Sequence, residues 1–318
     1  MEALAPLIVI LGPTASGKSA LGIRLAQQTD GEIIVCDSTQ VYRRFDIGTG
    51  KVSPADRRGI AHHLVDIIEP DGLFTAGEYR RQALLVLDQL GPCGKLPILT
   101  AGTGLYLRAL IQGLSDAPAR SDELRARLRN VANRKGPAHL HHILARLDRE
   151  AAARISPGDT QKVIRALEMR VLAGKPVGDI HRSGRRGLDG YQVTKIGLMP
   201  SRAELYVRIH ARINAMLNSG WIDEVRLLIA SGVPADAKPF QFIGYSQLRA
   251  HLEGNLSLED AVQEIQQATR RFAKRQITWF RKEPDVHWIS GFGDDPAVLA
   301  AVLRRVREAQ SRRQPQAR

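Results

Sequence analysis

Short apolar runs alternate with helical patterns over roughly the first hundred residues. Residues 7–11 and 96–100 are apolar stretches followed closely by glycine, and the apolar run at 32–37 ends in a carboxylate. Continuous apolar runs of this length are typical of strands that are buried on both faces. Residues 19–28 have helical spacing, and the capping box Thr75-Ala-Gly-Glu78 predicts a helix to about residue 90. The alternation predicts an α/β fold with a mostly parallel sheet.

The pattern becomes predominantly helical after about residue 115. Helical spacing covers residues 120–154, 161–172, 201–219, 221–230 and 257–281, and the apolar pattern at 193–199 predicts a returning strand. We therefore expect four segments: the first part of an α/β core at 1–115, a helical insertion at 116–155, the completion of the core with a basic helical region at 156–309, and a disordered polar tail at 310–318.

The segment Gly12-Pro-Thr-Ala-Ser-Gly-Lys-Ser19 matches the phosphate-binding pattern GxxxxGK[ST]. It lies directly after a predicted strand and directly before a predicted helix, which is the context that the motif requires. Backbone N–H groups and the helix N-terminus can surround an anion there, Lys18 supplies a positive charge, and Ser19 can bind Mg²⁺. The motif predicts a P-loop NTPase-like parallel sheet core, flanked by helices, that binds a diphosphate or triphosphate.

Two polar residues follow other predicted strands. Asp37 comes at the end of the second apolar run, and Thr103 follows the run at 96–100. Because ligands bind outside the carboxyl ends of parallel strands, Asp37 is a candidate Mg²⁺ ligand or proton acceptor beside the phosphate loop. The alternatives are a turn-capping role for Asp37 and a helix N-cap role for Thr103.

The overall charge points to a polyanionic partner. The 318 residues include 46 Lys and Arg against 33 Asp and Glu, a net charge of +13, and the pI is about 10.2. Nucleic acid is the first candidate and an anionic membrane surface the second, while a basic soluble enzyme without such a partner is the plain alternative. The two cysteines form no CxxC motif, which disfavours a disulfide or zinc scaffold and favours the reducing cytoplasm. No apolar stretch approaches the ~20 residues that a membrane-spanning helix needs.

Residues 270–282 form the most basic segment of the predicted C-terminal helices. They include six Lys or Arg and no acidic residue, with Phe272, Trp279 and Phe280 interleaved. The cations suit a phosphate backbone, and the aromatic rings could stack on an unpaired base. The same rings also fit an apolar helix face, and burial in the core is the favoured interpretation for them.

Taken together, these motifs resemble the bacterial tRNA dimethylallyltransferase (tRNA isopentenyltransferase) family over nearly the whole chain. The resemblance rests on GPTASGKS at 12–19, DSTQVYR at 37–43, DIGTGK at 46–51, HHLVD at 62–66, GTGLY at 102–106, RALE at 165–168, GY at 244–245 and KRQITWFR at 274–281. This combination is far more specific than the phosphate loop alone.

The resemblance implies a prenyltransferase. The dimethylallyl group of dimethylallyl diphosphate would pass to N6 of the adenosine directly 3′ of the anticodon, in tRNAs that read codons beginning with U. The phosphate loop would then hold an isoprenoid diphosphate, with Mg²⁺, in place of ATP. The implied partner is the tRNA anticodon stem-loop, clasped by the helical insertion, and the implied enzyme is a cytoplasmic monomer that does not associate with membranes.

The resemblance also implies roles for individual residues. Those implied in catalysis are Asp37 as proton acceptor, Thr103, Lys18 and Arg208, with Arg212 as the alternative to Arg208. Those implied in diphosphate binding are Gly12, Pro13, Thr14, Ala15, Ser16, Gly17, Lys18, Ser19, Arg165 and Arg212, with Ser19 also the metal ligand. Those implied in tRNA binding are Asp37, Ser38, Thr39, Gln40, Thr103, Arg125, Gln161, Lys162, Val163, Ile164, Arg165, Gln241, Gly244, Tyr245, Lys274, Arg275, Gln276 and Arg281.

The sequence departs from the family pattern at three positions. Ala101 replaces a frequent glycine, and Gln241 and Ser246 replace basic residues expected near RNA. Two other functions are compatible with the phosphate loop and the basic charge. A small-molecule P-loop kinase or NTPase would need ATP turnover, and a non-catalytic RNA-binding protein would use the loop only to hold a structural anion.

Overall fold

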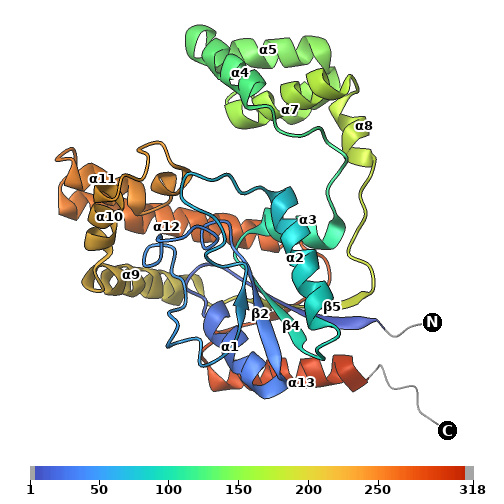
Figure 1. Cartoon of the computed structure of the whole chain (residues 1–318), viewed down its shortest axis with the longest axis vertical. Helices are drawn as coiled ribbons and strands as arrows, with labels where there is room; N and C mark the ends of the chain where they lie inside the picture. Colours follow the sequence, from blue (N-terminus) through green and yellow to red (C-terminus); the bar gives the residue numbers. More distant parts are fainter. Residues whose placement is uncertain (1–3, 312–318) are drawn as a thin grey trace. The chain divides into compact units, whose positions relative to one another are not determined.

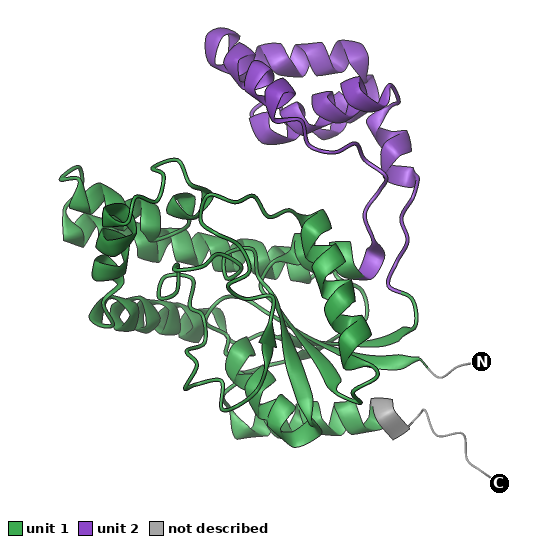
Figure 2. Cartoon of the chain, viewed as in Figure 1, with its two compact units in different colours: residues 1–110, 189–318 green, residues 111–188 purple. Residues whose placement is uncertain are grey.

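The computed structural model describes residues 4–311 and divides the chain into two compact units. The first comprises residues 1–110 and 189–318, and the second comprises residues 111–188 (Figure 2). Strands and helices both occur in the first unit, whereas every element described in the second is a helix. The helical unit is therefore an insertion between two parts of an α/β unit.

A six-stranded sheet with the order β3-β2-β4-β1-β5-β6 forms the centre of the first unit (Figure 1). Its strands are β1 (Ala5–Leu11), β2 (Gly31–Cys36), β3 (His62–His63), β4 (Leu96–Ala101), β5 (Tyr191–Leu198) and β6 (Val286–Ile289). All neighbouring strands pair in parallel. Because Leu11 and Cys36 both pair with Ala101, the carboxyl ends of β1, β2 and β4 lie level at one edge. The residues that follow these three strands are therefore neighbours.

Helices cover both faces of this sheet. On one face, α1 (Lys18–Thr29) and α13 (Pro296–Ser311) pack with alternate strand residues such as Ile8 and Ile10 in one core. Because side chains alternate along a strand, the intervening residues face the other side, where α2 (Ala76–Leu90) contacts β2 and β4. The sheet is buried on both faces, as its continuous apolar runs predict.

A second core of the first unit lies among the helices after β5. It combines α9 (Arg202–Asn218), α10 (Trp221–Ala230), the short 3₁₀ helix η1 (Lys238–Gln241), α11 (Tyr245–Leu252) and α12 (Leu258–Phe280) (Figure 1). Trp221, Tyr245 and Phe45 are fully or almost fully buried in it. Phe45 comes from the loop after β2, so this loop is anchored among the C-terminal helices.

The helical unit extends further than the sequence pattern suggested. Its helices are α4 (Asp122–Lys135), α5 (Pro137–Leu147), α6 (Arg149–Arg154), α7 (Thr160–Ala173) and α8 (Val177–Arg182). We expected an insertion at 116–155, but the compact unit spans 111–188. The reason is packing: α7 and α8 contribute Leu167 and Ile180 to the same core as Leu140. Asp148 links the start of α6 to the start of α8, because its carboxylate accepts hydrogen bonds from the N–H groups of Ala151 and Val177.

Most of the predicted elements are confirmed, and the misses are short or late in the chain. One of the two hydrogen bonds of the predicted capping box is confirmed, since the Thr75 hydroxyl accepts a hydrogen bond from the N–H of Glu78 at 3.1 Å. Strands β3 and β6 and helices α8, α11 and α13 were not predicted. Helix α13 runs to Ser311, so residues 310 and 311 are helical, while the rest of the expected tail at 312–318 lies outside the described residues. None of the helices between residues 4 and 311 is long and apolar enough to cross a bilayer. Helix α3 (Gly104–Gln112) completes the set of elements.

Candidate active site

The phosphate loop connects β1 to α1 through a strained turn. Ala15 has a φ of 63° and Gly17, the residue before α1, has a φ of 86°. A side chain at Gly17 would lie 2.8 Å from the backbone nitrogen of Gly293, so glycine is required there. Lys18 folds back over the loop, and its ammonium donates a hydrogen bond to the carbonyl of Pro13 at 2.8 Å. The loop has the concave form that binds anions at helix N-termini.

A cavity of about 760 Å³ opens beside this loop. Its walls come from the phosphate loop, the ends of β2 and β4, the loop after β2, and helices α9 and α12. The predicted site residues that line it are Thr14, Ala15, Gly17, Lys18, Ser19, Asp37, Ser38, Thr39, Gln40, Thr103, Arg212, Gln241, Arg275 and Gln276. Gly12, Pro13 and Ser16 belong to the same loop but are buried, and they do not line the cavity. The cavity thus joins the predicted anion site to the predicted strand-end residues.

Asp37 is anchored through one of its two carboxylate oxygens. Its Oδ1 accepts hydrogen bonds from the N–H of Thr39 at 2.9 Å and from the Thr39 hydroxyl at 2.6 Å. Its Oδ2 lies over Gly102, where a side chain would come within 2.3 Å of it. Asp37 therefore caps a turn through Oδ1, as the plain alternative expected, and still lines the cavity.

Thr103 is tied to the segment that follows Asp37. Its hydroxyl accepts a hydrogen bond from the N–H of Ser38 at 3.0 Å and donates to the Ser38 hydroxyl at 3.2 Å. Thr103 occupies the N-cap position of α3, because its carbonyl accepts a hydrogen bond from the N–H of Leu107 at 3.1 Å. Its hydroxyl, however, contacts Ser38 at the end of β2 and does not cap the first turn of α3. The two strand exits are thereby joined at the cavity wall.

Gln276 of α12 connects the phosphate loop to the end of β4. Its amide oxygen accepts a hydrogen bond from the N–H of Thr14 at 2.8 Å, and its amide nitrogen donates to the carbonyl of Gly102 at 2.8 Å. Gln276 is buried, and both ends of its amide are engaged within the protein. This differs from the expectation that Gln276 contacts RNA, and its long-range partners could not be read from the sequence.

Three cationic residues line the cavity, and two of them, Lys18 and Arg212, are half-buried while Arg275 is exposed. Burial lowers the pKa of Lys18 to about 8, with Asp37 raising it and Arg212 lowering it further. Burial also lowers the pKa of Arg212, opposed by Asp37. No hydrogen bond or ion pair joins the Arg212 guanidinium to any other residue between 4 and 311. Two desolvated cations beside a concave loop attract an anion strongly.

Arg208, one helical turn before Arg212, lies elsewhere. Its guanidinium donates to the Asp294 carboxylate at 2.7 Å and stacks over the Phe292 ring at 3.8 Å from the centroid. Arg208 does not line the cavity, whereas Arg212 does. Of the two alternatives for the catalytic arginine, the geometry therefore favours Arg212.

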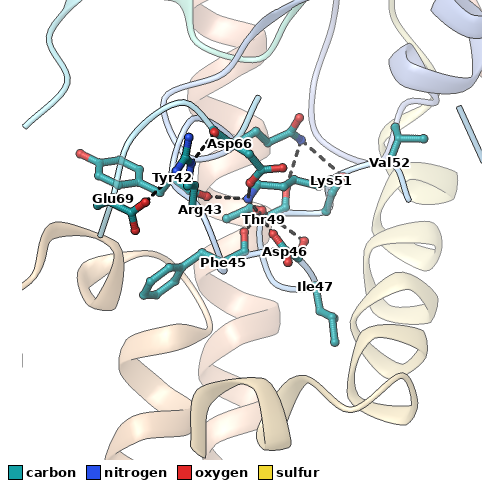
Figure 3. A network of polar contacts seen from close by, with 12 residues as sticks. Tyr42, Arg43, Phe45, Asp46, Ile47, Thr49, Lys51, Val52, Asp66 and Glu69 are labelled. Atoms are coloured by element: carbon teal, nitrogen blue, oxygen red, sulfur yellow. Dashed lines mark hydrogen bonds and ion pairs between the residues drawn. The ribbon is translucent and has the colours of Figure 1, made fainter. Parts of the chain in front are cut away.

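A polar network centred on the buried side chain of Lys51 holds the loop of residues 45–51 against the cavity. Figure 3 shows Lys51 between Asp46 and Asp66, and the ammonium of Lys51 forms ion pairs with both carboxylates. The side chain of Lys51 is only 4% exposed, so its charge depends on these two partners. The network fixes the loop whose residues Gly48 and Gly50 line the cavity.

The other end of this loop is held by α10 and α11. Glu224 accepts hydrogen bonds from the N–H of Ile47 at 2.8 Å and from the Tyr245 hydroxyl at 2.6 Å, while that hydroxyl accepts one from the N–H of Gly48 at 3.1 Å. Gly244 has a φ of 92° and lies against the Trp221 ring. Gly244 and Tyr245 are both buried, which differs from the expectation that they contact RNA directly.

The basic segment of α12 presents both charges and rings. Lys274, Arg275 and Arg281 are exposed, as a role at a phosphate backbone requires. Phe280 is buried, Phe272 is half-buried and Trp279 is 36% exposed, yet all three rings line the cavity. The prediction of core burial therefore holds for Phe280, whereas Trp279 is exposed enough to stack on a base. Gln241, at the end of η1, is exposed at the cavity as well.

The predicted site residues on α4 and α7 belong to the helical unit. Arg125 and Arg165 both form ion pairs with Glu168, whose side chain is completely buried. Arg165 also donates to the carbonyl of Pro118 at 3.2 Å and does not line the cavity. Gln161 and Lys162 are exposed, whereas Val163 and Ile164 are buried in the helical core and cannot present their side chains to RNA.

We expect Glu168→Gln to destabilise the helical unit by about 3 kcal/mol, because it leaves buried arginine contacts without their carboxylate. Burial opposes ionisation of Glu168, but hydrogen bonds from Arg125, Arg165 and the N–H of Ser121 lower its pKa to about 2. The stabilisation is therefore present above the ordinary glutamate pKa of 4.5 and is lost as the pH falls toward 2. Hydrogen exchange of residues 122–173 in the full chain measures the effect.

Glu123→Gln is the control, since Glu123 forms an exposed ion pair with Arg127 within one helix. Such pairs contribute roughly 0.5 kcal/mol or less. Equal exchange protection in the two variants would contradict a structural role for Glu168.

Comparison with known proteins identifies the family. A family model described as IPP transferase matches residues 40–283. The chain is 48% identical over 301 residues to the tRNA dimethylallyltransferase of Solibacter usitatus, covering 95% of this chain and 98% of that one. It is 47% identical to the enzyme of the same name from Koribacter versatilis, covering 94% of this chain and 97% of that one.

Solved structures agree in fold. The crystal structure of a full-length tRNA isopentenylpyrophosphate transferase from Bacillus halodurans superposes with a TM-score of 0.72 at 35% identity, covering 97% of both chains. A eukaryotic dimethylallyltransferase acting on tRNA superposes with a TM-score of 0.81 at 24% identity, covering 98% of this chain and 81% of that one. The P-loop NTPase-like fold expected from the sequence is confirmed.

Proposed function

Because the chain belongs to the IPP transferase family, we propose that it is a tRNA dimethylallyltransferase. It moves the dimethylallyl group of dimethylallyl diphosphate to N6 of the adenosine directly 3′ of the anticodon, in tRNAs that read codons beginning with U, and releases diphosphate. The observation that supports this most directly is the single cavity that Asp37 shares with the phosphate loop. A donor anchored on the loop and an amine beside Asp37 would meet inside it.

The donor's diphosphate would bind the loop N–H groups, Lys18 and Arg212. Breaking the allylic C–O bond leaves negative charge on the departing diphosphate. Hydrogen-bond donors and cations that are already in position stabilise that charge most effectively in a site shielded from water. Lys18 and Arg212 are both half-buried and line the cavity. Apolar residues of α9 and its surroundings, including Ile213, Met216 and Trp221, supply a wall that suits the isoprenoid chain.

We propose that Mg²⁺ accompanies the diphosphate. Ser19 lines the cavity, and its hydroxyl is an oxygen ligand of the kind that Mg²⁺ prefers. No cluster of three or more His, Cys, Asp or Glu side chains that could hold a metal occurs within the described residues, so diphosphate oxygens and water would complete the coordination. This fits Mg²⁺, which commonly binds through few protein ligands plus phosphate. The ion would neutralise charge on the leaving group.

The acceptor adenine would enter the cavity from the side of Asp37. A base must leave its stack to reach a buried donor, and a loop nucleotide loses least by doing so. The free Oδ2 of Asp37 would accept a proton from N6 as the new C–N bond forms. Thr103 and Ser38 hold the strand exits on either side, and Trp279 offers a partly exposed ring to the base.

We expect affinity for the anticodon stem-loop to fall linearly with salt on a log–log plot, because bound phosphates release counterions. Lys274→Ala and Arg281→Ala should each reduce the slope by about 1, measured by fluorescence anisotropy. Lys95→Ala is the control, because Lys95 precedes the amino end of β4, away from the strand ends that line the cavity. An unchanged slope in both α12 variants would remove this helix from the RNA surface.

The decisive experiment compares donors. Protein with Mg²⁺ receives labelled dimethylallyl diphosphate or ATP, with and without an unmodified anticodon stem-loop. We expect label to appear in the RNA only with the prenyl donor and only when the target adenosine is present. ATP hydrolysis indifferent to RNA would favour a P-loop kinase or NTPase, and RNA binding without turnover would favour a non-catalytic binder. We also propose that the enzyme is a cytoplasmic monomer, as the family resemblance implies.

A further inference from the structure

The turn between β6 and α13 lies directly behind the phosphate loop. Its residues 291–295 read Gly-Phe-Gly-Asp-Asp, and the N–H of Gly293 donates a hydrogen bond to the carbonyl of Ser16 at 2.9 Å. A side chain at Gly293 would come within 2.3 Å of the Gly17 carbonyl oxygen. A side chain at Gly17 would in turn meet the backbone of Gly293. Two glycines thus allow two backbones to touch where neither could otherwise approach.

Three other elements hold this turn in place. Arg208 of α9 donates to the Asp294 carboxylate at 2.7 Å and covers the Phe292 ring. Arg24 of α1 donates to the Asp294 carbonyl at 2.9 Å. Asp295 accepts a hydrogen bond from the N–H of Ala297 at 2.8 Å, at the start of α13. These contacts hold the turn in place independently of its contact with the phosphate loop.

The phosphate loop needs such support. Ala15 adopts a left-handed conformation that a residue with a side chain keeps only when its surroundings enforce it. Ser16 is completely buried between Ala15 and Gly17, and its carbonyl is the atom that the turn grips. A shift of this peptide would redirect the neighbouring N–H groups that converge on an anion.

We propose that residues 291–295 act as a brace that holds the phosphate loop in its anion-binding conformation, and that Arg208 is a positioning residue acting through Asp294. The inference rests on the proposed function only in requiring that the loop binds a diphosphate. It gives Arg208 a role that explains why its guanidinium is paired outside the cavity while Arg212 lies within it.

The test replaces Gly293 with alanine and measures the affinity for inorganic diphosphate with Mg²⁺ by calorimetry. Gly293 does not have a positive φ, so the substitution tests contact and not backbone strain. We expect affinity to fall at least about tenfold, equivalent to about 1.4 kcal/mol, while affinity for the anticodon stem-loop stays unchanged. Gly91→Ala is the matched control, because Gly91 has a helical φ of −55° and its nearest neighbour would be 3.7 Å away. Wild-type affinity in Gly293→Ala would overturn the proposal.

A second measurement covers the case in which Gly293→Ala does not fold. Arg208→Gln, Asp294→Asn and the double variant form a cycle in which the brace predicts equal losses of diphosphate affinity that do not add. Arg208→Lys, which can keep the ion pair, should restore most of the affinity. A loss confined to Arg208→Gln, with Asp294→Asn unaffected, would mean that Arg208 touches the diphosphate and would overturn the proposal.

These outcomes are separate from a failure of the proposed function. A wild-type protein that binds diphosphate but transfers no prenyl group to RNA would reject the prenyltransferase and leave the brace standing. A wild-type enzyme that transfers the group, with Gly293→Ala binding diphosphate normally, would reject only the brace.

Discussion

An Asp37→Asn enzyme is expected to transfer the prenyl group about 10²–10⁴ times more slowly than the wild type. The asparagine oxygen can still accept both hydrogen bonds from Thr39, so the turn keeps its shape. The amide nitrogen then occupies the place of Oδ2, over Gly102, and cannot accept a proton from the adenine amine. Single-turnover transfer to an anticodon stem-loop, with donor in excess, isolates this step from binding.

Asp30→Asn is the control for this substitution. Asp30 ends α1 with a φ of 48°, which asparagine tolerates, and its carboxylate is 79% exposed in an ion pair with Lys95. It should react at the wild-type rate. An undiminished rate in Asp37→Asn would show that the proton leaves by another route, and Asp37 would keep only its turn-capping role.

The second large effect is expected at the phosphate loop. Lys18→Met should weaken diphosphate binding by about 10²–10³-fold, because removing one partner of a buried charged contact costs roughly 2–5 kcal/mol. The methionine retains the length of the side chain while removing the charge and the hydrogen bond to the Pro13 carbonyl. Calorimetry with inorganic diphosphate and Mg²⁺ measures the loss, and Lys95→Met serves as an external control.

The lowered pKa of Lys18 adds a pH dependence to this prediction. Burial lowers the pKa to about 8, so the free enzyme holds the charged form below pH 8 and loses it above. A bound diphosphate favours the charged form again, so binding above pH 8 must take up a proton. Wild-type affinity should therefore fall as pH rises past 8, with proton uptake visible in buffers of different ionisation enthalpy. Neither effect should occur in Lys18→Met, and a flat wild-type profile would argue against Lys18 as a diphosphate contact.

The local part of the fold and site could be predicted from the sequence. The continuous apolar runs identify β1, β2 and β4, and the glycine-rich segment after β1 identifies the loop. The carboxyl ends of parallel strands lie at the same edge of a sheet. Asp37 and Thr103, which follow two of these strands, are therefore expected beside the phosphate loop, which follows a third. The resemblance to a known family added the reaction, which periodicity and spacing alone leave open.

What the sequence could not settle depends on partners far along the chain. Arg208 and Arg212 lie one turn apart on α9, and only the position of Asp294 decides that Arg208 points away from the cavity. The family resemblance placed Gln276 and Tyr245 at the RNA surface, but both side chains are buried and hydrogen-bonded to Thr14 and Glu224. Such pairings follow from tertiary packing and leave no periodic pattern.

The strand order also has a consequence for synthesis of the protein. β1 lies between β4 and β5, so its second edge stays unpaired until residues 191–198 leave the ribosome. The entire helical unit is translated in the interval, roughly 90 residues after β4, which at 5–20 residues per second lasts about 5–20 s. During that time the nascent chain exposes an apolar strand edge of the kind that pairs with other chains. A chaperone at the exit tunnel would shield it, and co-translational aggregation should therefore concentrate in chains stalled between β4 and β5.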